Sequence, residues 1–574
     1  MKTLLIFPPH WTPTMPHLAL PTLTAFLRAH GVEVAQRDLS VESFDAVLTR
    51  AYLEQAIDRL HRAPLSGQAA QTQGAAVAER VEGAKAVLRS PDFYVARPSL
   101  EAFLTIVQAL ELASLPFYPA SLGFTDYLSA APDNRSADLL HAVRDSAHNM
   151  FIELFRAGIV ADIARELPDL VAISIPTQGQ MLPAMTLAYL LKAAGLPCHI
   201  TVGGPHITML REQLLKTPAM FDLFDSAALF EGELPLLRLL EALDGGKPLS
   251  TVPNLLYREH GRIYATPIET SPFPDLLPDF AGLQLDRYLV PEPVLPLLSA
   301  HGCYHAKCGF CNVGYGRPRQ AVALDPDRVV EHMLHLKQRF GARHIFFADE
   351  AMTPPTARRL SHRLAAEGAP LHWCVCARFD RALTRDLLDQ MAAGGCRMLL
   401  FGLETASPSM IKAMHKGTQP EIMSRILRDS SAAGIWNHAF FFFGFPGETM
   451  ADAQETVNFL YAHQDALHSA SAGTFVLERY SPVHRSPAAY HVARMDDPPE
   501  RDLAIDFDYE LSQGIGNSLA ETLVSRLVEL LPSKRFGQYY INDVYRLLYA
   551  GYLRQAGQVL PLWIADPEPE PAGA

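Results

Sequence analysis

Residues 302–311 read Gly-Cys-Tyr-His-Ala-Lys-Cys-Gly-Phe-Cys, which places Cys303, Cys308 and Cys311 at the spacing C-x4-C-x2-C. Three thiolates within nine residues can converge on one metal centre. A structural zinc ion normally takes four protein ligands, whereas a [4Fe-4S] cluster held by three cysteines leaves one iron open to a substrate. The spacing therefore favours an iron–sulfur cluster.

The total number of cysteines supports a metal site, and the neighbouring histidines leave a zinc site open as an alternative. Seven cysteines in 574 residues are too few for a disulfide scaffold, so the chain is expected to be intracellular and reduced. Clustered cysteines in such a chain are better read as metal ligands. A Cys3His zinc site, with His301 or His305 as the fourth ligand, stays open as the alternative.

The cysteine stretch follows an apolar run, and further apolar runs come after it. The strand candidates are 295–300, 344–348, 372–376, 398–402, 437–443 and 474–478. Amphipathic helical segments separate them, one of them begun by Asp325-Pro326 as N-cap and first helical residue. Six such units in roughly 200 residues are too few for a closed eight-stranded barrel and predict an open, partial (β/α)6 barrel. Its active face is expected at the carboxyl ends of the strands.

The N-terminal part also alternates between strand and helix candidates. Strands are expected at 3–7, 32–35, 170–175, 199–202 and 227–230, with helices at 16–30 and 182–194. This alternation predicts an α/β fold in which a doubly wound parallel sheet binds its ligands at the carboxyl ends of its strands.

Composition shifts indicate the domain boundaries. We expect an N-terminal domain over 1–245 with a helical insertion at about 45–167, and a linker rich in Pro and Asp over 246–294. The barrel is expected over 295–494. A small helical C-terminal region then covers 495–574 and ends in a Pro/Glu tail that is predicted to be disordered.

Charge and hydropathy exclude some classes of function. The formal net charge is −13 and there is no long basic run, so a nucleic-acid groove is not expected. The longest aromatic run, 440–443, is far shorter than the roughly 20 apolar residues that span a bilayer, and prolines end the first apolar run too early for a signal peptide. The sequence therefore predicts a cytoplasmic protein without a membrane partner.

The motifs together resemble a known family. The stretch 302–311 is similar to the Gly-Cys-Tyr-Trp-Gly-Lys-Cys-x-Phe-Cys form of some cobalamin-binding radical S-adenosylmethionine (SAM) enzymes. Its first spacing is one residue longer than the usual C-x3-C-x2-C. The aromatic Phe310 before the last cysteine, the position after the first strand and the partial barrel agree with this resemblance. It implies three cofactors: a [4Fe-4S] cluster on the three cysteines, SAM and cobalamin.

The resemblance also implies roles for residues at successive strand ends. Glu350, or Asp349 as its substitute, would accept hydrogen bonds from the SAM amino group, and Arg378 would pair with the SAM carboxylate. Glu404 would bind the ribose hydroxyls, and Gly444 would line the adenine side. Taken singly, each residue could instead be a helix cap or a surface charge.

The N-terminal domain would then be the cobalamin-binding half. The Asp-x-His-x-x-Gly signature of other cobalamin proteins is absent, as in many radical SAM members, which implies cobalamin bound without that histidine. The candidate contacts follow the later strands of the sheet: Thr177, Gln178, Gly203, Gly204 and Glu231. Plain βα turns are the alternative interpretation of these residues.

The activity implied by the resemblance is reductive cleavage of SAM, abstraction of hydrogen from an unactivated carbon, and C-methylation of a peptide or small metabolite by methylcobalamin. Tyr480 is a candidate on the substrate side. An electron donor such as flavodoxin or ferredoxin is the expected partner. Radical rearrangement or cyclisation without methyl transfer, and a non-catalytic cobalamin- or metal-binding module, stay open as alternatives.

Overall fold

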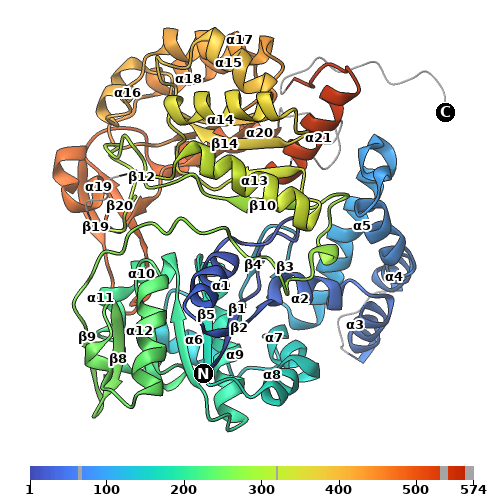
Figure 1. The fold of residues 1–574 in the computed structure, drawn as a ribbon, viewed down its shortest axis with the longest axis vertical. Coiled ribbons are helices and arrows are strands. Elements are labelled where there is room, and N and C mark those ends of the chain that lie inside the picture. Colours follow the sequence, from blue (N-terminus) through green and yellow to red (C-terminus); the bar gives the residue numbers. More distant parts are fainter. Residues whose placement is uncertain (63–67, 318–320, 530–540, 563–574) are drawn as a thin grey trace. The chain divides into compact units, whose positions relative to one another are not determined.

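The computed structural model describes residues 1–62, 68–317, 321–529 and 541–562 of the chain (Figure 1). Its residues separate into two compact units. The first comprises Met1–Pro291 with Pro498–Ile505, and the second comprises Glu292–Asp497 with Asp506–Ala574. Each unit has its own sheet, and the two are described in turn.

The first unit is built on a seven-stranded sheet. Its order is β2 (Glu33–Asp38), β1 (Lys2–Phe7), β5 (Leu170–Ser174), β6 (His199–Gly203), β7 (Ser226–Ala228), β8 (Leu255–Glu259) and β9 (Arg262–Ala265). The first five strands are parallel, and the direction of winding changes between β1 and β5. This sheet confirms the predicted doubly wound α/β fold.

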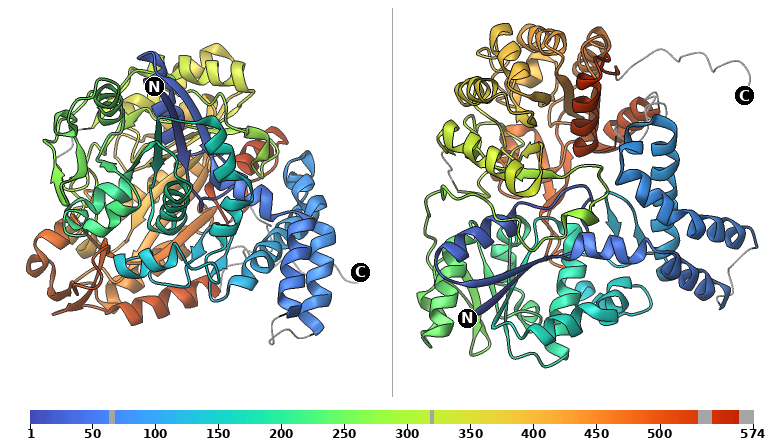
Figure 2. Two further views of the ribbon diagram at one scale, coloured as in Figure 1. Left: turned by 90° about the horizontal axis from the view of Figure 1, so that it is seen from below. Right: turned by 45° about the vertical axis from the view of Figure 1, so that its right-hand side comes forward.

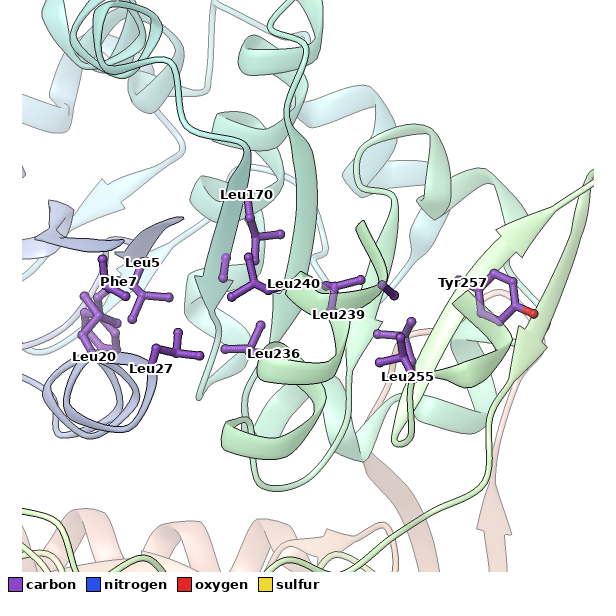
Figure 3. Packing of buried hydrophobic residues seen from close by; sticks show 14 residues of the cluster. Leu5, Phe7, Leu20, Leu27, Leu170, Leu236, Leu239, Leu240, Leu255 and Tyr257 are labelled. Carbon is purple, nitrogen blue, oxygen red and sulfur yellow. The ribbon is translucent and has the colours of Figure 1, made fainter. Parts of the chain in front are cut away.

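Helices α1 (Ala19–Ala29) and α12 (Glu233–Asp244) cover one face of this sheet. Figure 3 shows Leu20 and Leu27 of α1, with Leu236 and Leu240 of α12, meeting the buried side chains of the strands. Burial of such leucines contributes about 25 cal/mol per Å² of apolar surface. The hydrophobic spacing of both helices therefore fixes their position on the sheet.

The expected linker over 246–294 is wrong where it crosses residues 255–265. There β8 pairs antiparallel with β7 and β9 with β8, so the chain extends the first sheet before it leaves the unit. The sequence has weak periodicity there because β9 is an edge strand with little burial. The first unit consequently continues to Pro291.

The helical insertion lies within the first unit. It includes α2 (Leu39–Val47), α3 (Arg50–Arg62), α4 (Gln68–Leu88) and α5 (Ala96–Ser114), of which α3, α4 and α5 lie side by side (Figure 2). Within the described residues, the segment Ala96–Phe117 alone is long and apolar enough to cross a membrane. Its apolar window is 56% buried inside the fold, which is typical of a core helix.

The second unit is an open barrel of six parallel strands. Their order is β10 (Val294–Leu297), β13 (His344–Phe347), β14 (His372–Ala377), β15 (Cys396–Glu404), β16 (Trp436–Phe443) and β17 (Ser469–Thr474). The intervening helices are α13 (Pro326–Phe340), α14 (Pro354–Glu367), α15 (Arg385–Ala393), α17 (Pro420–Ala432) and α18 (Met450–Ala462). This arrangement confirms the predicted partial (β/α)6 barrel.

Two expectations about the end of the barrel are wrong. The sixth barrel strand is β17, not 474–478, because the run of small residues in Ser469–Thr474 pairs with β16. Within 474–478, β18 (Leu477–Glu478) belongs to a separate antiparallel sheet with β20 (Asp506–Leu511) and β19 (Val492–Asp496). The region after 495 therefore begins with strands, and its helices α20 (Asn517–Glu529) and α21 (Asp543–Gln555) follow them. The predicted disordered tail lies outside the described residues.

Helix α21 packs on the barrel strands at their amino ends. Gly551 of α21 lies so close to the first residues of β13 and β14 that an added Cβ would be 2.6 Å from His372 Nδ1 and 3.4 Å from His344 Cε1. Both histidines are buried. The glycine is therefore required by this close approach.

We expect Gly551→Ala to destabilise the docking of α21, although glycine to alanine normally stabilises a helix by about 0.5–1 kcal/mol. The overpacked Cβ should cost about 1–3 kcal/mol and speed amide hydrogen exchange in α21. The matched control is Gly83→Ala in α4, where nothing lies within 4 Å of the new Cβ and exchange should slow. Slower exchange in α21 of the Gly551 variant would contradict the close packing.

Candidate functional site

The cysteine loop, residues 302–311, leaves the first barrel strand at the carboxyl edge of the sheet. It begins after β11 (Ala300–His301), and its first peptide N–H, from Gly302, donates to Glu350 Oε2 at 3.0 Å. Ala306 takes a left-handed conformation with a φ of 48°, which turns the chain within the four residues between the first two cysteines. Cys308 is buried, and Cys303 and Cys311 are half-buried.

Residues 414–417, which we call the bracket, directly follow α16 (Pro408–Ala413). The bracket forms hydrogen bonds with the cysteine loop. The Gly309 N–H donates to the Met414 carbonyl at 2.9 Å. His305 Nε2 donates to the His415 carbonyl at 2.7 Å, because a carbonyl oxygen can only accept. Arg378 Nη2 donates to the Lys416 carbonyl. The cysteine loop is thus held by backbone groups and not only by its own turns.

The donor set suits an iron–sulfur cluster better than a single metal ion. Among the residues that the structure describes, no three His, Cys, Asp or Glu side chains are arranged to hold one metal ion. A [4Fe-4S] cluster distributes three cysteines over three irons, so their thiolates need not meet at one point. The Nε2 atom of His305 is engaged by the His415 carbonyl and is not available to zinc.

Burial also matters for the cysteine thiols. Desolvation raises the pKa of Cys311 to about 11, so without a metal this thiol is protonated at neutral pH. A metal ligand must be the thiolate, and binding of iron would therefore release the proton. The cysteines fit a cluster by number, spacing and burial, and their role stays a prediction.

The two carboxylates that follow β13, Asp349 and Glu350, differ in burial and in hydrogen-bond partners. Glu350 is exposed and contacts the cysteine loop through Gly302. Asp349 is buried and accepts hydrogen bonds from the Ser299 N–H at 2.8 Å and from the Ser299 hydroxyl. Burial raises the pKa of Asp349 to about 6. Of the two, Glu350 is the one placed to meet a ligand beside the cysteines, whereas Asp349 fixes the end of β10.

Glu404 ends β15 in a left-handed conformation and pairs with a lysine that sequence reasoning missed. Lys416 Nζ lies 2.8 Å from Glu404 Oε1, and the two side chains are only 7% and 13% exposed. The same ammonium lies 5.5 Å from the centre of the Phe310 ring. Gly402 makes room for the pair, because its Cβ would lie 2.6 Å from Glu404 Oε1. No sequence motif marks Lys416 as a site residue, because the folded bracket alone brings it next to Glu404.

Arg378 follows β14, and its guanidinium lies against the cysteine loop. Nη1 donates to Cys308 Sγ at 3.8 Å, and the guanidinium carbon lies 5.9 Å from the centre of the Tyr304 ring. The structure therefore places Glu350, Arg378 and Glu404 around the cysteine loop and its bracket. Their assignment to parts of SAM stays a prediction.

Gly444 follows β16, in a left-handed turn with a φ of 87°. Its N–H donates to Glu448, a buried carboxylate whose pKa is raised to about 7 by desolvation. Tyr480 also has a positive φ, but it follows β18 and not a barrel strand. Its ring lies 6.3 Å from that of His484. The structure brings Gly444 to the barrel edge and places Tyr480 in the neighbouring sheet region.

The cobalamin candidates all follow strands of the first sheet. Thr177 donates to Gln180 at 3.2 Å and Gln178 donates to Asp133 at 2.6 Å. Gly204 has a φ of 103°, and an added Cβ would lie 2.8 Å from the Ile175 carbonyl oxygen. Gly203 ends β6 beside it, and Glu231 follows β7 half-buried. They share the carboxyl edge of one sheet, and their contacts with a cofactor stay predictions.

Comparison with known proteins agrees with this architecture. Residues 297–460 match the model of the Radical SAM superfamily. An uncharacterized methyltransferase of Pyrococcus horikoshii is 27% identical over 315 residues, which are 52% of this chain and 66% of that protein. The chain thus spans about two thirds of the length of this relative.

Two solved structures share the fold over 97% of this chain. The cobalamin-dependent SAM radical enzyme OxsB, with aqua-cobalamin and SAM bound, has a TM-score of 0.60 at 15% identity over 71% of its chain. The radical SAM methyltransferase TsrM from Kitasatospora setae, with tryptophan substrate and a SAM analogue bound, has a TM-score of 0.57 at 15% identity over 96% of its chain.

These findings place a Radical SAM domain over residues 297–460 of the chain. Its barrel is a radical SAM domain, and the whole chain has the fold of the cobalamin-dependent members of that superfamily. The predicted fold class is confirmed, and the domain match agrees with the predicted radical SAM family.

We expect Lys416→Met to destabilise the second unit by about 3–5 kcal/mol, because it leaves the Glu404 carboxylate buried without its partner. The double variant Lys416→Met/Glu404→Leu should recover most of this loss. Urea unfolding followed by the fluorescence of the buried Trp373 and Trp436 measures the effect. Lys412→Met, at an exposed lysine of α16, is the matched control. Equal stabilities of the two lysine variants would contradict the buried pair.

Proposed function

We propose that the chain is a cobalamin-dependent radical SAM enzyme that cleaves SAM reductively and C-methylates a peptide or small metabolite. The observation that supports it best is the joint position of the cysteine loop, Glu350, Arg378 and Glu404 at one edge of a radical SAM barrel. A first unit with the fold of cobalamin-dependent relatives accompanies that barrel.

In this proposal the chain's own residues bind and orient the cofactors. The three thiolates ligate three irons, and Glu350 accepts hydrogen bonds from an ammonium group beside Gly302. Glu404, oriented by Lys416, accepts hydrogen bonds from ribose hydroxyls, and the turn at Gly444 lines the adenine side. When bound, the cluster and SAM supply a 5'-deoxyadenosyl radical and cobalamin supplies a methyl group.

The first unit would hold cobalamin at the carboxyl edge of its parallel sheet, where ligands bind in such folds. Thr177, Gln178, Gly203, Gly204 and Glu231 lie at that edge. The missing side chain of Gly204 lets this turn pack against Ile175, because an added Cβ would lie 2.8 Å from the Ile175 carbonyl oxygen.

The substrate side is proposed from chemistry and from the similar structures. TsrM was solved with tryptophan as substrate, which supports a small metabolite or a peptide side chain as the substrate class. A flavodoxin or ferredoxin would supply the electron in the cytoplasm, and no role for nucleic acid or membrane is proposed. Tyr480 stays a candidate on the substrate side.

Metal content tests the proposal. Protein purified anaerobically from cells supplied with cobalamin should hold about four irons and one cobalt per chain. The variant with alanine at Cys303, Cys308 and Cys311 should lose only the iron.

The matched control carries alanine at the other cysteines of the barrel, Cys374, Cys376 and Cys396, and should keep both metals. Iron without cobalt would contradict the role of the first unit. Zinc without iron would contradict the whole mechanism and restore the zinc alternative.

A second candidate function keeps both cofactors but omits methyl transfer, because OxsB is described only as a cobalamin-dependent SAM radical enzyme. The two candidates differ in their products. Methyl transfer should yield S-adenosylhomocysteine together with 5'-deoxyadenosine when substrates are screened, starting with tryptophan and tryptophan-containing peptides. Turnover that gives 5'-deoxyadenosine and a rearranged product without S-adenosylhomocysteine would favour the second candidate.

A further inference from the structure

Arg378 forms hydrogen bonds with the cysteine loop and with the bracket. Its guanidinium is half-buried, with Nη1 donating to Cys308 Sγ at 3.8 Å and Nη2 donating to the Lys416 carbonyl. Cys308 is itself buried, at 8% exposure. Both outer nitrogens of the guanidinium are thus engaged by the loop and its bracket.

Of the cations near the cysteine loop, Arg378 is the one that the structure shows donating to Cys308. Lys416 is neutralised by Glu404 at 2.8 Å. Asp380 accepts a hydrogen bond from the Tyr304 hydroxyl at 3.2 Å. Within the part of the chain that the structure describes, no carboxylate forms an ion pair with Arg378. A guanidinium without a carboxylate partner keeps its full charge for the hydrogen bond that it donates to the Cys308 sulfur.

Hydrogen bonds to the cysteine sulfurs are among the factors that set the reduction potential of an iron–sulfur cluster. Reduction adds one electron to the cluster and its thiolates, and a cationic donor stabilises the state with more negative charge. A guanidinium has five N–H donors, and the structure shows two of them in use, one toward Cys308 Sγ and one toward the Lys416 carbonyl. The observed contact of Nη1 is therefore with the Cys308 sulfur.

We propose that Arg378 raises the reduction potential of the [4Fe-4S] cluster by donating a hydrogen bond to the Cys308 thiolate. The proposal rests on the proposed function, in which the three cysteines hold the cluster. In the redox step an external one-electron donor reduces the cluster by one electron. No covalent bond of the protein forms or breaks, and Arg378 stays protonated throughout.

The test is a redox titration of the cluster, followed by electron paramagnetic resonance, with dithionite as reductant and without SAM. Arg378→Gln removes the charge and should shift the midpoint potential to more negative values. The matched control is Arg381→Gln, an exposed arginine that donates to Gln419, and its potential should equal that of the unsubstituted protein. Iron content is measured for each protein, so that only loaded clusters are compared.

Equilibrium dialysis with radiolabelled SAM separates the two roles of Arg378. The proposal predicts that SAM affinity of Arg378→Gln stays within about threefold of the unsubstituted protein, less than one charge-assisted hydrogen bond is worth. An unchanged midpoint potential in Arg378→Gln would overturn the proposal. If the unchanged potential came with a tenfold or greater loss of SAM affinity, Arg378 would be assigned to the SAM carboxylate.

Arg378→Lys keeps the inference testable if the glutamine variant fails to hold four irons. Lysine keeps the charge but cannot donate to both acceptors as the fork of arginine does, so a smaller negative shift is expected. A potential equal to that of the unsubstituted protein would overturn the proposal. Absence of a cluster from the unsubstituted protein itself would instead contradict the proposed function.

Discussion

Two consecutive backbone carbonyls, those of Met414 and His415, hold the cysteine loop at the carboxyl edge of the barrel, and the next carbonyl, that of Lys416, holds Arg378 beside it. This constraint matters because the proposed cluster would need three thiols that face it, while the loop that carries them has little secondary structure. A parallel barrel brings the ends of all its strands to one edge, and the bracket adds a firm support between β15 and β16. The site therefore depends on where α16 ends as much as on the cysteines themselves.

The buried Lys416–Glu404 pair also fixes the position of the bracket, at its contact with the end of β15. A buried ion pair adds little net stability, but it is costly to break, so it holds its two side chains in one arrangement. Here it couples the bracket to the end of β15, with Gly402 leaving the space that the pair occupies. The position of the cysteine loop and the orientation of Glu404 are consequently set by one short segment.

Most of the architecture could be predicted because its signals are local. Buried strands separated by amphipathic helices mark both sheets, and the cysteine spacing marks the loop. The failures occurred where local signals were weak: β9 is an exposed edge strand, and β17 consists of small residues. Lys416 could not be found from sequence, because its partners Glu404 and Phe310 come together only through the folded turn of the bracket.

The polar groups at this edge are already paired within the protein. Glu350 accepts from Gly302, Arg378 donates to Lys416 and Cys308, and Glu404 holds Lys416. Each of these charged groups keeps donor or acceptor capacity for a ligand, and a hydrogen bond to a charged group contributes about 1.5–3 kcal/mol net. The pairs within the protein hold these side chains in one arrangement before any ligand arrives, so less side-chain ordering would accompany binding at this edge.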